Sequence, residues 1–288
     1  MEWHDIRSPA DPELDRLAEL YQLHPLHIED CRHRHQNAKV EESPSYLFAV
    51  LKVVQLRPDG TLEETDLDLF LGKDYLITVQ EADHRLAREI LDRIKLATNH
   101  TRPDQAFYRI LDAVVDSYLP AIDQYSDTID ELEEQVLKAP APDALAKIFS
   151  TKRLLIQTRR ILGNTRDITG HLQRTDNDLV ARDLLPFFRD VYDHLARNLD
   201  LVEMQRDLLT GSLDIYLSSV ANRTNQVMKV LTILGTIALP SLVISGFFGM
   251  NVQTLPWLHS PYSGWIVSSL MVASTAALLV LLKILRWF

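Results

Sequence analysis

The chain has 288 residues, and its 40 acidic residues against 30 basic ones give a formal net charge of −10. Nucleic acid is excluded as an expected partner, because its binding draws energy from Lys and Arg placed against phosphates. Divalent cations have the right charge, although many acidic surfaces serve only solubility. The single cysteine, Cys31, excludes an intrachain disulfide, and the N-terminus lacks the basic-then-apolar pattern of a signal peptide. We therefore expect the polar part of the chain to lie in the cytosol.

Residues 1–100 are predicted to form a small α/β domain. Helical spacing indicates helices at 13–21 and 84–96, the first with Leu14, Leu17, Leu20 and Tyr21 on one face. Apolar runs predict strands at 46–56, 67–71 and 75–79, with a turn at residues 58–60 after the first. The chain carries no Gly-rich phosphate loop and no nucleophile elbow, so we do not expect an enzyme.

Residues 101–229 are predicted to be helical throughout. One long helix is expected from Asp104 to about Lys138, a second over 142–162, and a short helical piece over 165–174. From Pro186 no proline interrupts the chain before Pro240. A helix from Pro186 to Gly249 would be roughly 90–100 Å long at 1.5 Å per residue. A helix of that length needs partner helices.

Residues 230–288 are predicted to form a membrane hairpin. No Asp, Glu, Lys or Arg occurs from Val230 to Leu282, which leaves room for two spans of about 20 residues around a break at 247–251. Basic residues flank this stretch, and the connecting loop has none. The positive-inside rule then places both termini in the cytoplasm and the loop outside, as in a multi-pass protein of the plasma (inner) membrane.

One seven-residue register on the long helix carries aspartates and then small or apolar residues. It reads Asp193, Asp200, Asp207, Asp214, Ala221, Met228, Gly235, Leu242 and Gly249. A seven-residue repeat keeps one stripe of a helix facing its partners. If several copies pack around an axis, this stripe lines a channel with an acidic ring and an apolar neck. The predicted pore-lining residues are Asp214, Asn225, Met228, Leu231, Gly235 and Leu242. Alternatively, the aspartates face water while another stripe packs.

Several strings in the chain resemble the CorA family of divalent-cation transporters. They are residues 222–232, Pro240 inside the first span, Gly249-Met250-Asn251 closing that span, and the strings at 24–30, 188–194 and 213–219. The resemblance covers essentially the whole chain. It implies a funnel-shaped homopentamer in the lipid bilayer, with an α/β cytosolic domain, a long-helix stalk and the first span lining the pore. It also implies Mg²⁺ uptake, with Co²⁺ and Ni²⁺ often admitted.

The resemblance implies a selectivity filter at Gly249, Met250 and Asn251. Mg²⁺ dehydrates reluctantly, so neutral amide and carbonyl oxygens suit a first contact with the hydrated ion. The alternative for Gly249 and Asn251 is an ordinary helix C-cap, since both residue types favour the left-handed conformation there. The two interpretations are compatible.

The resemblance further implies that cytosolic Mg²⁺ bound between subunits favours the closed state. The matching carboxylates are Glu29, Asp30, Asp112 and Asp190. Carboxylates gathered across an interface repel one another, and a divalent ion removes that repulsion. Without the resemblance, each would be interpreted as a solvated charge or a salt-bridge partner.

Two other functions remain open. The outer loop has no Asp or Glu, whereas the family often carries an acidic residue there. The first alternative is therefore a related ZntB-like transporter that moves Zn²⁺, with or without proton coupling. From a different class, an acidic domain on a two-span anchor would suit a membrane-anchored cation sensor that conducts nothing.

Overall fold

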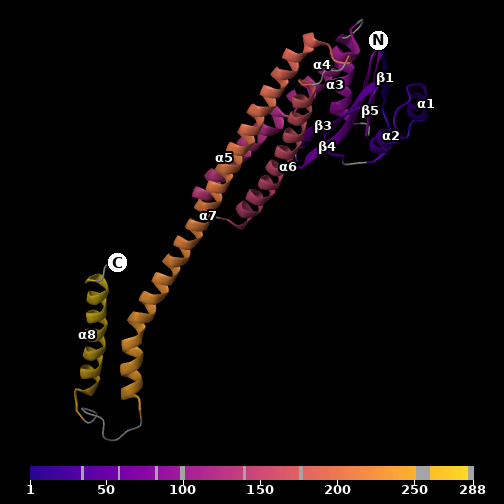
Figure 1. Cartoon of the computed structure of the whole chain (residues 1–288). Helices are drawn as coiled ribbons and strands as arrows, with labels where there is room; N and C mark the ends of the chain where they lie inside the picture. The colour runs from indigo at the N-terminus through magenta and orange to yellow at the C-terminus, as the bar shows by residue number, and fades with distance from the viewer. Residues whose placement is uncertain are drawn as a thin grey trace. The chain divides into compact units, whose positions relative to one another are not determined.

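The computed structural model describes residues 1–33, 36–57, 59–81, 84–97, 101–138, 141–174, 178–250 and 260–284. The chain divides into two compact units, Met1–Asp214 and Ile215–Phe288 (Figure 1). The boundary falls inside the longest helix, α7 (Leu185–Phe248), so each unit is described by itself.

The first unit is built on a five-stranded mixed sheet with the order β1-β5-β4-β3-β2. β1 runs parallel to β5, and the other neighbours are antiparallel. The strands are β1 (Glu2–Ile6), β2 (Lys39–Glu42), β3 (Tyr46–Leu56), β4 (Leu62–Gly72) and β5 (Tyr75–Gln80). The three predicted strands are confirmed, with β4 longer than predicted. At the predicted turn, Gly60 adopts φ +80°, while Pro58 lies outside the described residues.

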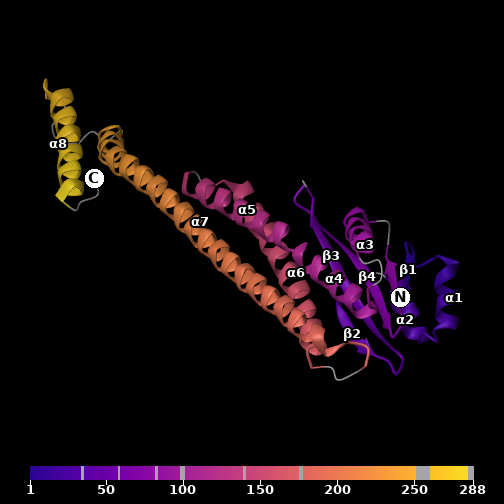
Figure 2. The same ribbon diagram turned by 90° about the horizontal axis from the view of Figure 1, so that it is seen from above.

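Helices cover both faces of this sheet. α1 (Pro12–Leu20) and α2 (Pro25–Arg32) pack on one face, while α3 (Arg85–Ala97) and α4 (Pro103–Asp116) lie against the other (Figure 2). Because both faces are buried, β3 is almost continuously apolar rather than alternating. Leu20, predicted to share one face of α1 with Leu14 and Leu17, does not share their burial: its exposed fraction is 63%, whereas theirs is 0%. Each three-residue step rotates about 60° short of a full turn, so two steps carry Leu20 away from Leu14.

Three ionisable side chains, Lys52, Asp66 and Asp68, are buried on the face of the sheet that also packs against α2. Lys52 on β3 forms an ion pair with Asp66, which lies directly opposite it on β4. Asp68 lies two residues further along the same face and contacts the Cys31 thiol of α2. Burial raises the pKa of Asp68 to about 8, and the neighbouring Asp66 adds to this effect. One ammonium group serves two buried carboxyls, so Asp68 holds its proton at neutral pH.

The helical region differs from the prediction in two places. The single helix predicted over 104–138 is two helices, α4 and α5 (Leu119–Lys138), because Pro120 has no N–H for the carbonyl of Asp116 and its ring clashes there. Conversely, α6 (Pro142–Leu172) is continuous where a break was predicted after residue 162. Its Thr165 is buried and hydrogen-bonds the Tyr118 hydroxyl, so tertiary packing overrides the weak helix propensity of Gly163.

Within the first unit, α7 follows a short 3₁₀ turn (Arg182–Leu184) and packs through a seven-residue stripe of its own. The buried residues of this stripe are Phe188, Leu195, Val202 and Leu209. Gln205 is also buried, and its amide donates to the Ile122 carbonyl and the Ser126 hydroxyl of α5. The aspartate register is exposed on another side of the helix. A single chain therefore packs through a different stripe, and a channel-lining role for the aspartates stays a prediction.

The second unit contains the remainder of α7 and α8 (Ser263–Ile284). Both helices are long and apolar enough to cross a membrane, and their most apolar windows are 0% and 6% buried. A core helix of a soluble protein would be mostly buried, so the low burial favours contact with lipid. Pro240 lies inside α7, and just before it the Thr232 and Thr236 hydroxyls donate to the carbonyls of Met228 and Thr232. The basic residues that follow the uncharged stretch are Lys283, which is described, and Arg286, which lies outside the described residues.

The buried Asp68 predicts a specific loss of stability at alkaline pH. Its pKa is raised in the folded chain, so its contribution is fully present below its ordinary pKa near 3.8 and disappears as the pH rises to about 8. We expect the thermal midpoint of the full chain in detergent to fall by about 5 °C between pH 6 and pH 8. Asp68→Asn, which cannot ionise, should remove most of that fall, as measured by thermal unfolding across pH. Asp74→Asn, at an exposed position, is the matched control. A pH profile of Asp68→Asn that matches the parent protein would contradict this account.

Candidate metal site

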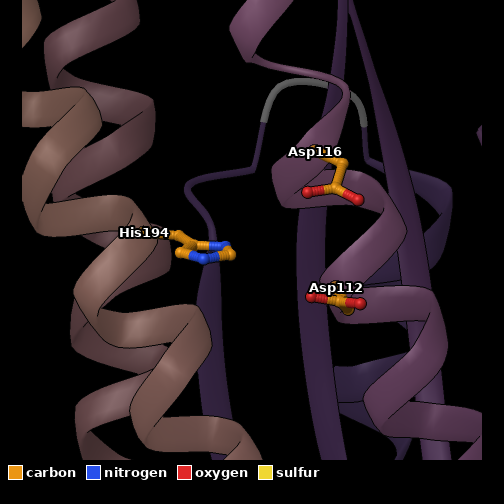
Figure 3. Close-up of side chains that lie close together, drawn as sticks. All are labelled: Asp112, Asp116 and His194. Carbon is orange, nitrogen blue, oxygen red and sulfur yellow. The ribbon is translucent and has the colours of Figure 1, made fainter.

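Asp112 and Asp116 of α4 and His194 of α7 form a cluster of metal-ligating side chains. One ligand atom from each residue lies within 4.8 Å of the others. The two aspartates are four residues apart, so they share one face of α4. Figure 3 shows the imidazole of His194 reaching from α7 toward the two carboxylates.

The packing of α4 explains why the cluster forms here. One face of α4 carries Phe107, Ile110 and Val114, which are fully buried, and α4 lies against strands β3 to β5. The ring of Tyr108 contacts Phe188 edge-on, with 5.7 Å between centroids, and so joins α4 to α7. With the apolar face of α4 on the sheet, Asp112 is left half-buried beside α7.

Negative charge is in excess at this place. Burial raises the pKa of Asp112, the carboxylates of Asp116 and Asp190 raise it further, and His194 opposes them. Burial also raises the pKa of Tyr108 to about 12, together with the charges of Asp112 and Asp190. Asp190 Oδ2 lies 3.7 Å from His194 Nε2. Three carboxylates and one imidazole therefore meet where α4 contacts α7.

This donor set fits a divalent cation. Mg²⁺ takes carboxylate oxygens and keeps several of its waters, whereas Zn²⁺, Co²⁺ and Ni²⁺ also accept imidazole nitrogen. The raised pKa of Asp112 has a direct physical consequence: a cation placed among these groups would relieve a repulsion that the folded chain otherwise bears.

The structure groups the four predicted regulatory carboxylates only in part. Asp112 and Asp190 belong to the α4–α7 cluster. Glu29 and Asp30 lie on α2, across the sheet from α4, where Asp30 is ion-paired with Lys39 and Glu29 is mostly exposed beside His33. Whether Glu29 and Asp30 share an ion with another subunit stays a prediction.

Sequence reasoning missed Asp116 and His194. Asp116 follows Asp112 by four residues, and His194 follows Asp190 by four. On helices, that spacing places each missed residue beside a named carboxylate. The spacing was therefore the signal that could have found them.

The predicted filter begins at the point where α7 ends. The helix ends at Phe248, and the Gly249 N–H donates to the Ser245 carbonyl at 2.8 Å. Gly249 is not among the glycines with positive φ, so the alternative of a left-handed helix C-cap does not explain it. A Cβ at Gly249 would lie 2.9 Å from the Ser245 carbonyl oxygen, so close approach to the backbone is what favours glycine. Met250 is exposed, and Asn251 lies outside the described residues.

The predicted pore-lining residues are exposed in the single chain. In the first unit this is Asp214, and in the second unit the set is Asn225, Met228, Leu231, Gly235 and Leu242. Residues that line a pore between copies must be exposed in a single chain, but residues that face lipid are exposed as well. Exposure alone therefore does not distinguish the two positions. Their position in a pore stays a prediction.

The structure combines two membrane-capable helices with a carboxylate-rich cluster, features that fit a membrane protein that handles divalent cations. The family model described as CorA-like Mg²⁺ transporter protein matches residues 1–284. The chain therefore belongs to the CorA family, whose members are metal-ion transporters rather than enzymes.

Individual relatives agree with this assignment. The cobalt/magnesium transport protein CorA of Thermotoga maritima is 35% identical over 278 residues, which are 95% of this chain and 79% of the relative. The complete structure of the CorA magnesium transporter from Methanocaldococcus jannaschii matches 98% of this chain and 89% of its own, with a TM-score of 0.86 at 24% identity. The ZntB cytoplasmic domain from Vibrio parahaemolyticus matches 77% of this chain and 88% of its own, with a TM-score of 0.61 at 13% identity. The two structural matches show the fold alone.

Removing one carboxylate from the cluster should have two effects of opposite sign. Asp116→Asn should raise the thermal midpoint of the metal-free protein by about 1–3 °C, because it relieves repulsion on Asp112. The same change should raise the Mg²⁺ concentration needed for protection from protease by about tenfold, because a ligand is lost. Thermal unfolding and limited proteolysis across a Mg²⁺ titration measure the two effects. Asp127→Asn, exposed on α5, is the matched control and should change neither. If Asp116→Asn lowers the thermal midpoint, or leaves the Mg²⁺ dependence unchanged, the cluster is not a cation site.

Proposed function

We propose that this chain forms a homopentameric channel that admits Mg²⁺ passively into the cytosol, with Co²⁺ and Ni²⁺ also accepted. The observation that carries the proposal is Gly249-Met250-Asn251 following directly on the end of the first membrane-capable helix, α7, in a chain of the CorA family. The relative from Thermotoga maritima is named as a cobalt/magnesium transport protein. In this proposal the chain lies in the plasma membrane, with both termini cytoplasmic.

Conduction would begin at neutral oxygens. The Asn251 amides and the backbone carbonyls near Gly249 offer hydrogen bonds to the water shell of the arriving ion, without the cost of removing that shell. Below them, Leu242, Gly235 and Met228 would form an apolar neck that closes by losing its water, and Asp214 would attract cations at its cytosolic end. Two successive sites of different chemistry let the ion enter without being trapped.

Gating would depend on the α4–α7 cluster. Asp112, Asp116, Asp190 and His194 are the residues that would hold a cytosolic divalent cation, together with Glu29 and Asp30 of another subunit. With a cation bound, the repulsion is relieved and the closed arrangement is favoured; at low cytosolic Mg²⁺ the carboxylates repel again and the subunits loosen. This provides feedback through preferential binding to the closed state.

A ZntB-like Zn²⁺ transporter is the second candidate. His194 supplies an imidazole at the cluster, a ligand that Zn²⁺ accepts more readily than Mg²⁺ does. The likeness to the ZntB cytoplasmic domain shows a shared fold, so the fold does not distinguish the two functions.

Ion flux in proteoliposomes distinguishes the two functions. The purified full chain should admit Mg²⁺ down its concentration gradient, at a rate that does not depend on a pH gradient. Fluorescent Mg²⁺ and Zn²⁺ indicators inside the vesicles, with and without an imposed pH gradient, measure this. Proton-driven Zn²⁺ entry without Mg²⁺ entry would overturn the proposal in favour of the second candidate.

Asn251→Ala tests the proposed role of the filter, and the parent chain in the same assay tests whether the protein conducts; unchanged uptake by the variant would contradict the filter. Loss of the amide should reduce Mg²⁺ uptake by at least about tenfold, because the first polar contact for the hydrated ion is gone. The same proteoliposome assay measures it, and Gln253→Ala in the same loop is the matched control, expected to retain uptake. If no metal flux above that of empty vesicles is found even for the parent chain, the non-conducting sensor is favoured instead.

A further inference from the structure

The carboxylate of Asp30 is already ion-paired with a lysine side chain of its own chain. The ammonium of Lys39 lies 2.7 Å from Asp30 Oδ2 and 2.6 Å from Glu41 Oε1, so it joins α2 to the edge strand β2. The Lys39 and Asp30 side chains are only 31% and 22% exposed. The pair is thus more enclosed than an ordinary surface salt bridge, and its geometry is correspondingly fixed.

A second set of contacts holds the lysine in this place. Glu41 Oε2 lies 3.0 Å from Nε2 of the buried His27, and His27 Nδ1 lies 2.8 Å from the Tyr46 hydroxyl. The His27 ring stacks on Phe48, with 4.5 Å between centroids. Because Glu41 pairs with Phe48 in the β2–β3 register, it belongs to the sheet framework. Glu41 therefore positions the ammonium group against Asp30.

Lys39 remains charged in this setting. Burial acts to lower the pKa of Lys39, but its hydrogen bonds to Asp30 and Glu41 outweigh burial, so the pKa is raised. The hydrogen bond from Lys39 lowers the pKa of Glu41, burial opposes this effect, and the contact with His27 lowers the pKa further. The three groups form a charged set in which one ammonium serves two carboxylates.

The situation of Asp30 is the reverse of that of Asp112. Around Asp112 the neighbouring carboxylates raise the pKa, and the cluster gains from any added cation. At Asp30 a tethered ammonium already occupies one of the two carboxylate oxygens. An incoming divalent cation must displace the ammonium or bind beside a like charge, and either reduces its affinity.

We propose that Lys39 is a built-in competitor for the regulatory cation at Asp30, and that it sets the cytosolic Mg²⁺ concentration at which the regulatory site fills. The inference rests on the proposed role of Asp30 as a regulatory ligand. Glu41 makes the exchange reversible: a displaced Lys39 keeps one carboxylate partner and stays within reach of Asp30. Without Lys39 the site would fill at lower Mg²⁺ and hold the protein in its ion-bound state.

The test is a Mg²⁺ titration of the full chain in detergent, read by limited proteolysis and, separately, by the rise in thermal midpoint. Lys39→Met should lower the Mg²⁺ concentration for half-protection by about three- to fivefold, since an enclosed ion pair no longer opposes binding. Lys39→Arg keeps the charge and should stay close to the parent value. Lys73→Met, at an exposed position, removes the same charge elsewhere in the unit and should shift nothing.

A second variant keeps the test decisive if Lys39→Met folds poorly. Glu41→Gln leaves Asp30 as the only carboxylate for the ammonium, so displacing it costs more and the half-protecting Mg²⁺ concentration should rise. A fall or no change with Glu41→Gln would contradict the competition.

Asp30→Asn separates the two proposals. If Asp30→Asn raises the half-protecting concentration but Lys39→Met matches Lys73→Met, the competition is wrong while the regulatory role of Asp30 stands. If Asp30→Asn leaves the titration unchanged, Asp30 is not a regulatory ligand and both proposals fail. If Asp30→Asn raises the half-protecting Mg²⁺ concentration and Lys39→Met lowers it, both proposals are supported.

Discussion

Repulsion between carboxylates at the contact of α4 with α7 is the interaction on which the proposed regulation depends. α4 is fixed to the sheet by its apolar face, and Tyr108 joins it to Phe188 of α7, so Asp112 cannot move far from Asp116 and Asp190. The rigid packing holds like charges together that would separate in water. The same helix, α7, carries His194 near its start and ends just before Gly249. The α7 residues of the proposed sensor and the membrane-capable segment therefore belong to one continuous helix.

In the first unit, the charge of buried and half-buried carboxyl groups is compensated to three different extents. The charge of Asp66 is balanced by Lys52 opposite it in the sheet, and Asp68 stays neutral by keeping its proton. Asp112 has no lysine partner and lies beside two further carboxylates. The first two arrangements are complete within the chain and support the fold. The third is incomplete and leaves a free-energy gain for an external cation. Asp30 falls between these cases, because its partner Lys39 lies at a partly exposed strand edge where exchange is feasible.

Local pattern predicted two of the longest elements almost to the residue. β3 was predicted with its observed bounds, and α7 within a residue at each end, because each is long and punctuated by proline, glycine or turn residues. β1 and β2 were missed: they are short, and their polar residues are stabilised by pairing with distant strands rather than by local preference. The break before Pro120 follows from the local chemistry of proline and was overlooked, whereas the continuity through Gly163 required knowledge of tertiary contacts such as that of Thr165 with Tyr118. Asp112 and Asp190 were found through family resemblance; Asp116 and His194 lie four residues after them, but the packing of α4 on α7 was needed to show that all four groups meet.

The proposed filter and the proposed sensor make opposite demands on the same ion, and this explains their different chemistry. A filter must release what it binds, so neutral oxygens at Gly249-Met250-Asn251 that address the water shell suit it. A sensor must hold the ion over the concentration range of the cytosol, so charged oxygens at Asp112, Asp116 and Asp190 suit it. Charge at the filter would slow release, and neutral ligands at the sensor would not compete with water. In this proposal the uncharged stretch binds the ion weakly and so lets it pass. The acidic unit before it binds the ion strongly and so responds to its cytosolic concentration.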